Sequence, residues 1–577
     1  MGDTQANQRK KTRGEDYIAQ GSILAVAVVI TKIIGVVYRI PLTNILGDEG
    51  NGFYGYAYQV YAIALMLSSL SLPTAVSKLV SVRMAVGQRR NAFRVFLCSL
   101  IFAVSVGIII SLAIFLGAGA ISEHMMKAPF SVYALKVLSP GLLIVAVMAV
   151  LRGYFQGLGT MVPTAVSQII EQIINAVVSI VGASVLFGMG SRAGEKAGEE
   201  LLGPAYGAAG GTLGTVIGAA AGLLFLLFVL WIFKGGIRRQ IQRDHTKGKE
   251  SYSHILKILV MTAIPVIFST AIYNINKILD LTVFNHIMDA QGFTESEYMA
   301  LQGIYTGKYD PLINVPMSIP YALSTSIVPA LTTVVMARNR KKTHYQIDQT
   351  LRLTTIITLP SCVGFLVLAS PLMVLLYNDA GKVPAQLLML GSVVIILYGW
   401  STITNAVLQG LNYLSSPAKN AAAALVVHLG ALVLMLTVFK LNVYALVGSN
   451  IKSCAGTFPS SLYRSNIVFA VIMCVLNQRK IRQVCGFRIN IRRTFVKPLI
   501  ASAIMGVITY AVHFGLHRLI GGRVIPTVLA IIVAVIVYGV LILKLGALSE
   551  KDIQALPMGT RILRGCQALK LMPPSEE

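Results

Sequence analysis

Several charged side chains lie within long apolar stretches of this sequence. Outside one irregular segment (449–464), the cations are Lys32, Lys136, Lys277 and Lys308, and the anions are Glu171, Asp280 and Asp310. A charge at the centre of a bilayer costs at least about 2.5–3.5 kcal/mol, so such residues usually face a protein interior or a watery cavity and serve a function. Ammonium groups in a cavity of low dielectric attract phosphates strongly, because Coulomb forces are weakly screened there. The chemistry predicted is anion binding inside a membrane.

The spacing of these residues predicts which of them share a helix face. Lys32 and Arg39 are two helical turns apart, so one helix presents both on the same side. Asn274, Lys277 and Asp280 recur at intervals of three residues and predict a polar stripe on a second helix.

A third stretch adds Tyr305 and Lys308. We expect Lys32, Lys277 and Lys308 to line one cavity and to bind a pyrophosphate there.

Neutralisation by nearby acids is the alternative for two of these lysines. Lys277 and Asp280 have the spacing of an ion pair on one helix turn. Lys308 and Asp310 are two residues apart and point in different directions, so they do not suit a pair.

Other polar residues allow two interpretations each. Arg39 and Lys136 are near span ends. The alternative for them is that their side chains extend to the membrane interface and bind no substrate. Glu171 could carry a proton or anchor its helix, and the structural role is favoured. Asp280 could bind a coupling cation or tune Lys277. Four tyrosines could form an interface belt, the favoured reading, or stack on a sugar: Tyr54, Tyr56, Tyr58 and Tyr61.

The composition shows what kind of chain must position these residues. Of its 577 residues, 55% are hydrophobic and 12% are charged, against about 25% charged in soluble domains. This excludes a disordered chain, a coiled coil and an ordinary soluble enzyme. The net charge of +26 fits basic cytoplasmic loops better than a nucleic-acid partner. The six cysteines show no metal-site or disulfide pattern.

The predicted fold class is an all-α polytopic membrane protein with about 14 spans. The spans are expected near 17–38, 53–77, 95–119, 131–151, 164–188, 205–233, 254–284, 303–335, 353–376, 384–407, 418–439, 442–476, 495–516 and 524–545. With the N-terminus inside, most Lys and Arg residues fall on cytoplasmic segments, as the positive-inside rule requires. Both termini, 1–16 and 546–577, are therefore expected in the cytoplasm.

Two halves of the chain share short matches at a nearly constant offset. Gly52-Phe-Tyr54 corresponds to Gly303-Ile-Tyr305, and Gln156-Gly-Leu158 to Gln409-Gly-Leu411. The repeat predicts two six-helix lobes, 17–235 and 254–476, related by a pseudo-two-fold axis and joined by a basic linker, 236–253. Helices within 495–545 have no counterpart. Two facing lobes suggest alternating access.

Longer motifs carry a family resemblance. Arg152-Gly-Tyr-Phe-Gln-Gly157, followed by Pro163-Thr-Ala-Val-Ser-Gln-Ile-Ile-Glu-Gln172, resembles the polysaccharide-transporter branch of the MOP flippase superfamily. Leu72-Pro-Thr-Ala-Val-Ser-Lys-Leu79 is similar to that branch too. The likeness is to its lipid II flippase-like and stage V sporulation protein B-like members.

The resemblance implies a function. Such proteins flip an undecaprenyl-pyrophosphate-linked saccharide from the inner to the outer leaflet of a bacterial plasma membrane. It implies a cationic cavity formed by spans 1, 2, 7 and 8, and a groove for the lipid tail near spans 13 and 14. The expected partners are this substrate, membrane lipids and a coupling ion, H⁺ or Na⁺, with no cofactor.

One segment departs from this pattern. Residues 442–476 are too long for a plain span, and Ser449-Asn-Ile451 recurs as Ser465-Asn-Ile467. Removal of 449–464 restores a clean apolar run, which predicts an insertion there, with a sequence error as the alternative.

Two rival functions follow from the same residues. A multidrug–cation antiporter of the superfamily would favour twelve spans and cavity carboxylates. A membrane glycosyltransferase or polymerase would need a catalytic external loop, and the longest one, 285–302, shows no such pattern. The sequence has no P-loop for ATP hydrolysis and no zinc-protease motif, so a transporter that is not an enzyme is expected.

Overall fold

The computed structural model describes residues 2–69, 72–244, 246, 248–413, 415–438, 465–548 and 567. In this part of the chain the regular structure is helical throughout. Eleven of its helical runs are long and apolar enough to cross a membrane. The all-α polytopic fold class is confirmed, and helix covers nearly all described residues of each predicted span, apart from turn residues such as Ser69 and Val438.

The chain divides into two compact units, residues 1–307 and 308–577. The division falls between Gly307 and Lys308, later in the chain than the linker expected at 236–253. The two six-helix lobes therefore stay a prediction. The insertion expected at 449–464 lies outside the described residues.

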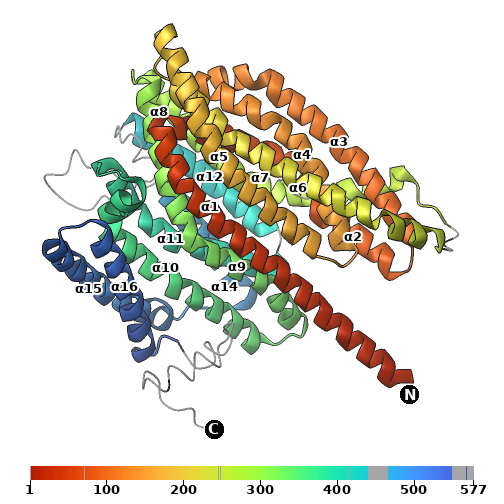
Figure 1. Cartoon of the computed structure of the whole chain (residues 1–577). Coiled ribbons are helices and arrows are strands. Elements are labelled where there is room, and N and C mark those ends of the chain that lie inside the picture. Colours follow the sequence, from red (N-terminus) through yellow and green to blue (C-terminus); the bar gives the residue numbers. More distant parts are fainter. Residues whose placement is uncertain are drawn as a thin grey trace. The chain divides into compact units, whose positions relative to one another are not determined.

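The first unit consists of long helices joined by short turns (Figure 1). They are α1 (Gly2–Ser68), α2 (Leu72–Ala85), α3 (Arg89–Ala120), α4 (Val132–Gly157), α5 (Val162–Ala197), α6 (Leu202–Gln242), α7 (Tyr252–Ala290) and α8 (Glu295–Gly303).

Helix α1 joins two segments that the sequence divides into separate spans. Its only non-helical residue is Gly47, at φ +68°, a conformation that glycine adopts without a steric penalty. The stretch between the expected spans 17–38 and 53–77 is therefore helical apart from this kink, and the helix ends at Ser68, before α2 begins.

Small residues let the helices of the first unit approach closely. A Cβ atom added to Gly210 on α6 would lie 2.1 Å from the carbonyl oxygen of Gly182 on α5, and one added to Gly214 would lie equally close to Ser179 Oγ. Close backbone approach of this kind gives membrane helices their van der Waals packing. Helices α2, α3 and α4 share an apolar core that includes Val76, Val95 and Val150.

The second unit begins in a π-helical turn, Ile304–Tyr309, whose first residues belong to the first unit. It continues with α9 (Asp310–Met336), α10 (Arg340–Tyr377), α11 (Lys382–Gly410), α12 (Ser415–Thr437), α14 (Ser465–Cys485), α15 (Lys497–Ile520) and α16 (Val524–Lys544). Helices α15 and α16, expected within 495–545, pack on each other and on α10.

Candidate functional site

Arg39 lies in an aromatic cluster of the first unit. Its guanidinium is 4.2 Å from the centre of the Tyr54 ring, a cation–π contact. Tyr54 stacks on Tyr58 with ring centres 5.9 Å apart, and Tyr58 contacts Tyr61 at 6.0 Å. Arg39 thus lies against a row of phenol rings from a later part of the same helix, α1.

The burial of these tyrosines bears on whether they form an interface belt or stack on a sugar. Tyr54, Tyr56 and Tyr61 are buried inside the unit and so do not form an interface belt. Tyr58 is the exception, with 41% of its surface exposed. Only Tyr58 of the four is available to stack on a ligand.

Helix α5 brings Glu171 to the same part of the unit as α1. The Glu171 carboxylate accepts a hydrogen bond from Arg152 Nη2 at 2.7 Å, and Arg152 Nε donates to Ser167 Oγ at 3.0 Å. Asn175, one turn along from Glu171, donates to the Tyr38 hydroxyl at 3.3 Å. The Arg152 partner was missed in the sequence because it lies on α4, a different helix.

Lys32 and Lys277 are exposed on α1 and α7, whereas Asp280 is buried, with 3% of its surface exposed. Asn274 lies on α7 as well, in a stretch described by its backbone alone. The Tyr56 hydroxyl donates to the Leu281 carbonyl oxygen, which holds this part of α7 against α1.

A buried amide network beside this contact was also missed. Gln302 Nε2 donates to Asn285 Oδ1 at 2.6 Å and to the Tyr56 hydroxyl at 3.1 Å. Asn285 in turn donates to the Met126 carbonyl oxygen at 2.8 Å. Asn285 and Gln302 lie just outside the predicted spans 254–284 and 303–335, so no amide within an apolar span pointed to this network, although buried amides need partners.

Lys308 belongs to the second unit and is paired there. Its ammonium lies 2.5 Å from a carboxylate oxygen of Asp379, in the turn between α10 and α11, and Lys308 is 7% exposed. The other carboxylate oxygen accepts a hydrogen bond from the Gly381 N–H at 2.7 Å. Tyr305, three residues before Lys308, is partly exposed in the π-helical turn.

The charge around Asp379 sets its protonation. Burial alone would raise the pKa of this carboxyl, but hydrogen bonds from Lys308 and from the Gly381 N–H, with the charge of Lys308, lower it below its ordinary value. At neutral pH the Asp379 carboxyl is therefore ionised.

Comparison with known proteins adds the family. Residues 18–335, more than half of the chain, match the family model described as polysaccharide biosynthesis protein. This chain belongs to that family. The resemblance read from the Arg152–Gly157 and Leu72–Leu79 motifs is confirmed.

Two curated relatives from Bacillus subtilis (strain 168) cover most of the chain. Lipid II flippase MurJ is 26% identical over 501 residues, 84% of this chain and 86% of the relative. Stage V sporulation protein B is 25% identical over 417 residues, 72% of this chain and 77% of the relative.

Two solved structures share the fold. An inward-facing multidrug resistance MATE family transporter of the MOP superfamily matches 79% of this chain and 96% of its own, with a TM-score of 0.61 and 16% identity. The inward closed conformation of lipid II flippase MurJ matches 90% of this chain and 97% of its own, with a TM-score of 0.57 and 14% identity. Together with the membrane helices, these comparisons identify a multi-pass membrane protein that shares the fold of these transporters.

Proposed function

We propose that the chain is a flippase that moves an undecaprenyl-pyrophosphate-linked saccharide from the inner to the outer leaflet by alternating access. The observation that supports this most is the similarity to lipid II flippase MurJ over 84% of the chain. The chain then acts in transport and not in catalysis, needs no cofactor, and resets with a gradient of H⁺ or Na⁺ or with the membrane potential.

The proposed pyrophosphate ligands are Lys32, Arg39, Lys277 and Lys308. Lys32 and Lys277 are exposed residues of α1 and α7. Lys308 has Asp379 as a partner, so an anion that binds Lys308 must displace that carboxylate. The residues proposed to support this site or the coupling ion are Asp280, Asn274, Glu171 and Tyr305.

The test is binding of the purified full chain to lipid II and to undecaprenyl pyrophosphate. Lys32→Ala and Lys277→Ala should each weaken both affinities about tenfold, since a hydrogen bond to a charged group contributes about 1.5–3 kcal/mol. Lys136→Ala is the matched control, because Lys136 is an exposed lysine of α4 outside the proposed site. Unchanged binding in both variants would place the pyrophosphate elsewhere.

An antiporter of organic cations is the second candidate. The observation in its favour is the TM-score of 0.61 with a multidrug resistance transporter, which is a likeness of fold. Tight binding of organic cations, together with no binding of either undecaprenyl lipid, would replace the flippase proposal with this one.

A further inference from the structure

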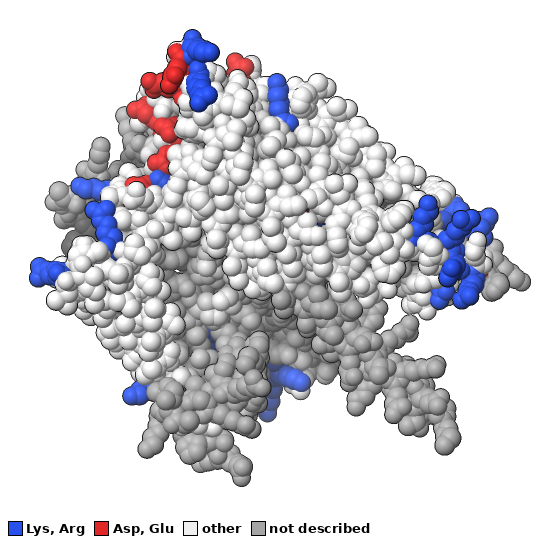
Figure 2. Space-filling view, in the orientation of Figure 1, with Lys and Arg blue, Asp and Glu red and all other residues white. Residues whose placement is uncertain are grey.

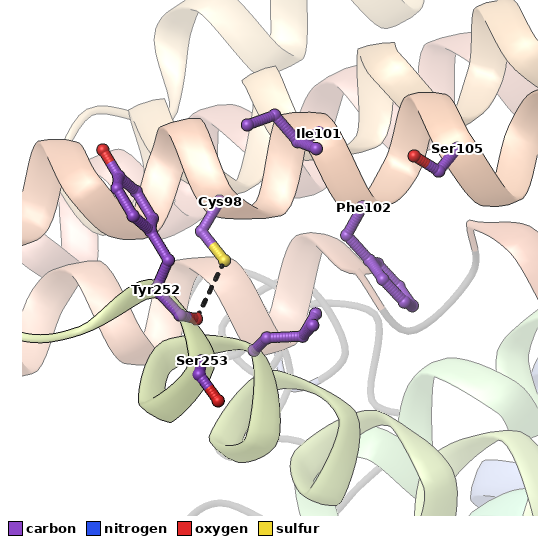
Figure 3. Close-up of a pocket in the computed structure, with 7 residues that line it drawn as sticks. Cys98, Ile101, Phe102, Ser105, Tyr252 and Ser253 are labelled. Carbon is purple, nitrogen blue, oxygen red and sulfur yellow. Dashed lines mark hydrogen bonds between the residues drawn. The ribbon is translucent and has the colours of Figure 1, made fainter.

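A cavity of about 370 Å³ lies between α3 and the start of α7, within the first unit (Figure 3). Its lining residues come from the two helices: Cys98, Ile101, Phe102, Ser105, Tyr252, Ser253 and Leu256. Cys98 Sγ donates a weak hydrogen bond to the Tyr252 carbonyl oxygen at 3.5 Å, which holds the two walls together.

The cavity is apolar and opens outward. Ile101 is 65% exposed, and it lies on α3, a helix apolar enough to cross a membrane. The mouth of the cavity therefore lies on an exposed apolar face of α3, which suits contact with the hydrocarbon of a bilayer. Its volume is at the lower end of the range for ligand pockets, about 300–1,000 Å³, and suits part of a hydrocarbon chain whose remainder lies in the bilayer.

The basic side chain of Arg94 lies beside the cavity, against its lining residue Tyr252. Arg94 precedes Cys98 by one turn of α3, and its guanidinium lies 4.2 Å from the centre of the Tyr252 ring. Arg94 Nε is buried and donates no hydrogen bond to any described residue. Within the described part of the chain, no carboxylate forms an ion pair with Arg94. The Arg94 guanidinium thus carries a charge beside the apolar cavity that no described carboxylate neutralises.

More positive charge surrounds this end of the unit. Arg89 and Arg90 are exposed at the start of α3, and Arg238, Arg239 and Arg243 are exposed at the end of α6. The Arg90 N–H donates to Asp244 at 2.6 Å, so the two ends lie side by side. Figure 2 shows a cluster of basic side chains over this end. Anionic lipids concentrate at such basic surfaces and bind in basic pockets between membrane helices.

We propose that the groove between α3 and α7 is a binding site for an anionic glycerophospholipid. Its phosphate contacts the Arg94 guanidinium, and part of one acyl chain fills the cavity beside Ile101 and Phe102. Guanidinium groups suit phosphate because their planar N–H donors match its oxygens. The site is separate from the proposed pyrophosphate ligands and does not depend on them.

Native mass spectrometry of the full chain in detergent tests the site, with phosphatidylglycerol as the probe and phosphatidylcholine and undecaprenyl phosphate as comparisons. Arg94→Gln should raise the Kd for the first phosphatidylglycerol about tenfold. Arg89→Gln removes the same charge from the exposed start of α3 and should leave the Kd within about twofold, because exposed charges contribute little. Arg94→Lys keeps the charge without the planar donors, so its Kd for phosphatidylglycerol should lie between those of the wild type and Arg94→Gln.

A second pair of variants tests the cavity itself. Ile101→Trp places bulk at the mouth and should weaken phosphatidylglycerol binding, whereas Ile109→Trp should not. Ile109 is 66% exposed on the same helix and does not line the cavity. The proposal is overturned if Arg94→Gln binds no more weakly than Arg89→Gln, if the two tryptophan variants bind alike, or if undecaprenyl phosphate is the lipid whose binding depends on Arg94.

Discussion

At the scale of single residues, charge inside this protein is balanced between helices. Arg152 on α4 pairs with Glu171 on α5, and Lys308 pairs with Asp379 beyond the end of α10. In both pairs the basic side chain is the more buried partner. Removal of one partner of a buried pair costs more than removal of both, because the remaining charge stays without compensation.

The Lys308–Asp379 pair gives the first prediction. Asp379→Asn should destabilise the protein by about 2–4 kcal/mol, or several degrees in Tm, because it leaves the buried ammonium uncompensated. The double variant Lys308→Met/Asp379→Asn should be more stable than Asp379→Asn alone. Thermal unfolding of the wild type, both single variants and the double variant in detergent measures this. A double variant that loses the sum of both single effects would contradict the pairing.

The same carboxyl predicts a dependence on pH. The pKa of Asp379 is lowered in the folded protein from its ordinary 3.8. Its stabilisation should therefore be complete above about pH 5 and should be lost as the pH falls below 4, through the folded-state pKa. The difference in Tm between wild type and Asp379→Asn, followed from pH 7 to pH 3, should stay constant at first and then shrink. A difference that shrinks between pH 7 and pH 5 would be inconsistent with this.

A variant of Glu171 can distinguish between the two roles considered for this residue, a structural one and proton coupling. Glu171→Gln keeps an acceptor for Arg152 but loses the charge, so we expect a loss of about 1–3 kcal/mol in stability. The pH dependence of transport, measured in proteoliposomes, should be retained. Glu200→Gln, at an exposed carboxylate before α6, is the control. Transport that becomes independent of pH only in Glu171→Gln would make Glu171 a proton carrier.

The sequence could identify these charges but not their partners. A charge within an apolar run is visible directly, and each of the named residues is indeed on a membrane helix or beside one. The partner of Lys308 could not be found this way. Spacing argues against Asp310, and Asp379 approaches from a turn 71 residues later. Contacts between helices depend on packing, which local periodicity does not contain.

At the scale of elements, two matching glycines meet where α1 crosses α8. A Cβ atom on Gly303 would lie 1.7 Å from the Asp48 carbonyl oxygen, and one on Gly52 would lie 2.3 Å from the Met299 carbonyl oxygen. These are the glycines that open the two repeated Gly-x-Tyr segments. The repeat thus has a packing reason, since each copy lets its helix approach the other backbone.

Gly303→Ala should force this crossing apart. Overpacking of this kind costs about 1–3 kcal/mol. Cysteines at Glu49 and Ser296, whose side chains are 3.3 Å apart, report the separation through a short bismaleimide in a background without the native cysteines. Cross-linking should fall in Gly303→Ala and stay unchanged in Gly188→Ala, since a Cβ at Gly188 meets no atom within 4 Å. Equal cross-linking in both would show that the helices tolerate the extra methyl group.

The segment between α6 and α7 is bound to the ends of α2 and α3. The Arg83 guanidinium forms two hydrogen bonds to the Glu250 carboxylate, and Asn91 exchanges hydrogen bonds with Gly248 and Glu250. From composition this basic stretch, 236–253, resembles a simple linker. Its attachment could not be predicted because each bond joins residues more than 150 positions apart.

Helices themselves were the most predictable feature. Apolar runs of about 20 residues must be helical in a bilayer to satisfy their backbone groups. The kink at Gly47 was less predictable, because a polar stretch such as 39–52 is typical of a loop and of an exposed helix turn alike.

At the scale of the whole molecule, charge separates along the first unit. Helix α6 has exposed acids just before its start, Glu199 and Glu200, and exposed arginines at its end, Arg239 and Arg243. Basic residues resist translocation, so we propose that the arginine end and both chain termini are cytoplasmic.

Cysteine labelling of intact cells tests this orientation. In a background without the native cysteines, Glu200→Cys and Asp289→Cys should react with a membrane-impermeant maleimide, whereas Lys249→Cys should react only after permeabilisation. All three positions are exposed, so reactivity reports the side of the membrane. Labelling of Lys249→Cys in intact cells would reverse the proposed topology.

The division of the chain at Gly307 has a consequence for biosynthesis. The last helices of the first unit, α7 and α8, pack on α1, which leaves the ribosome before them. More than 200 further residues must therefore be synthesised before α1 can make these contacts, as in the Tyr56–Leu281 hydrogen bond. Once residue 307 has emerged, every helix of the first unit is present, and that unit can assemble while the second is still being translated.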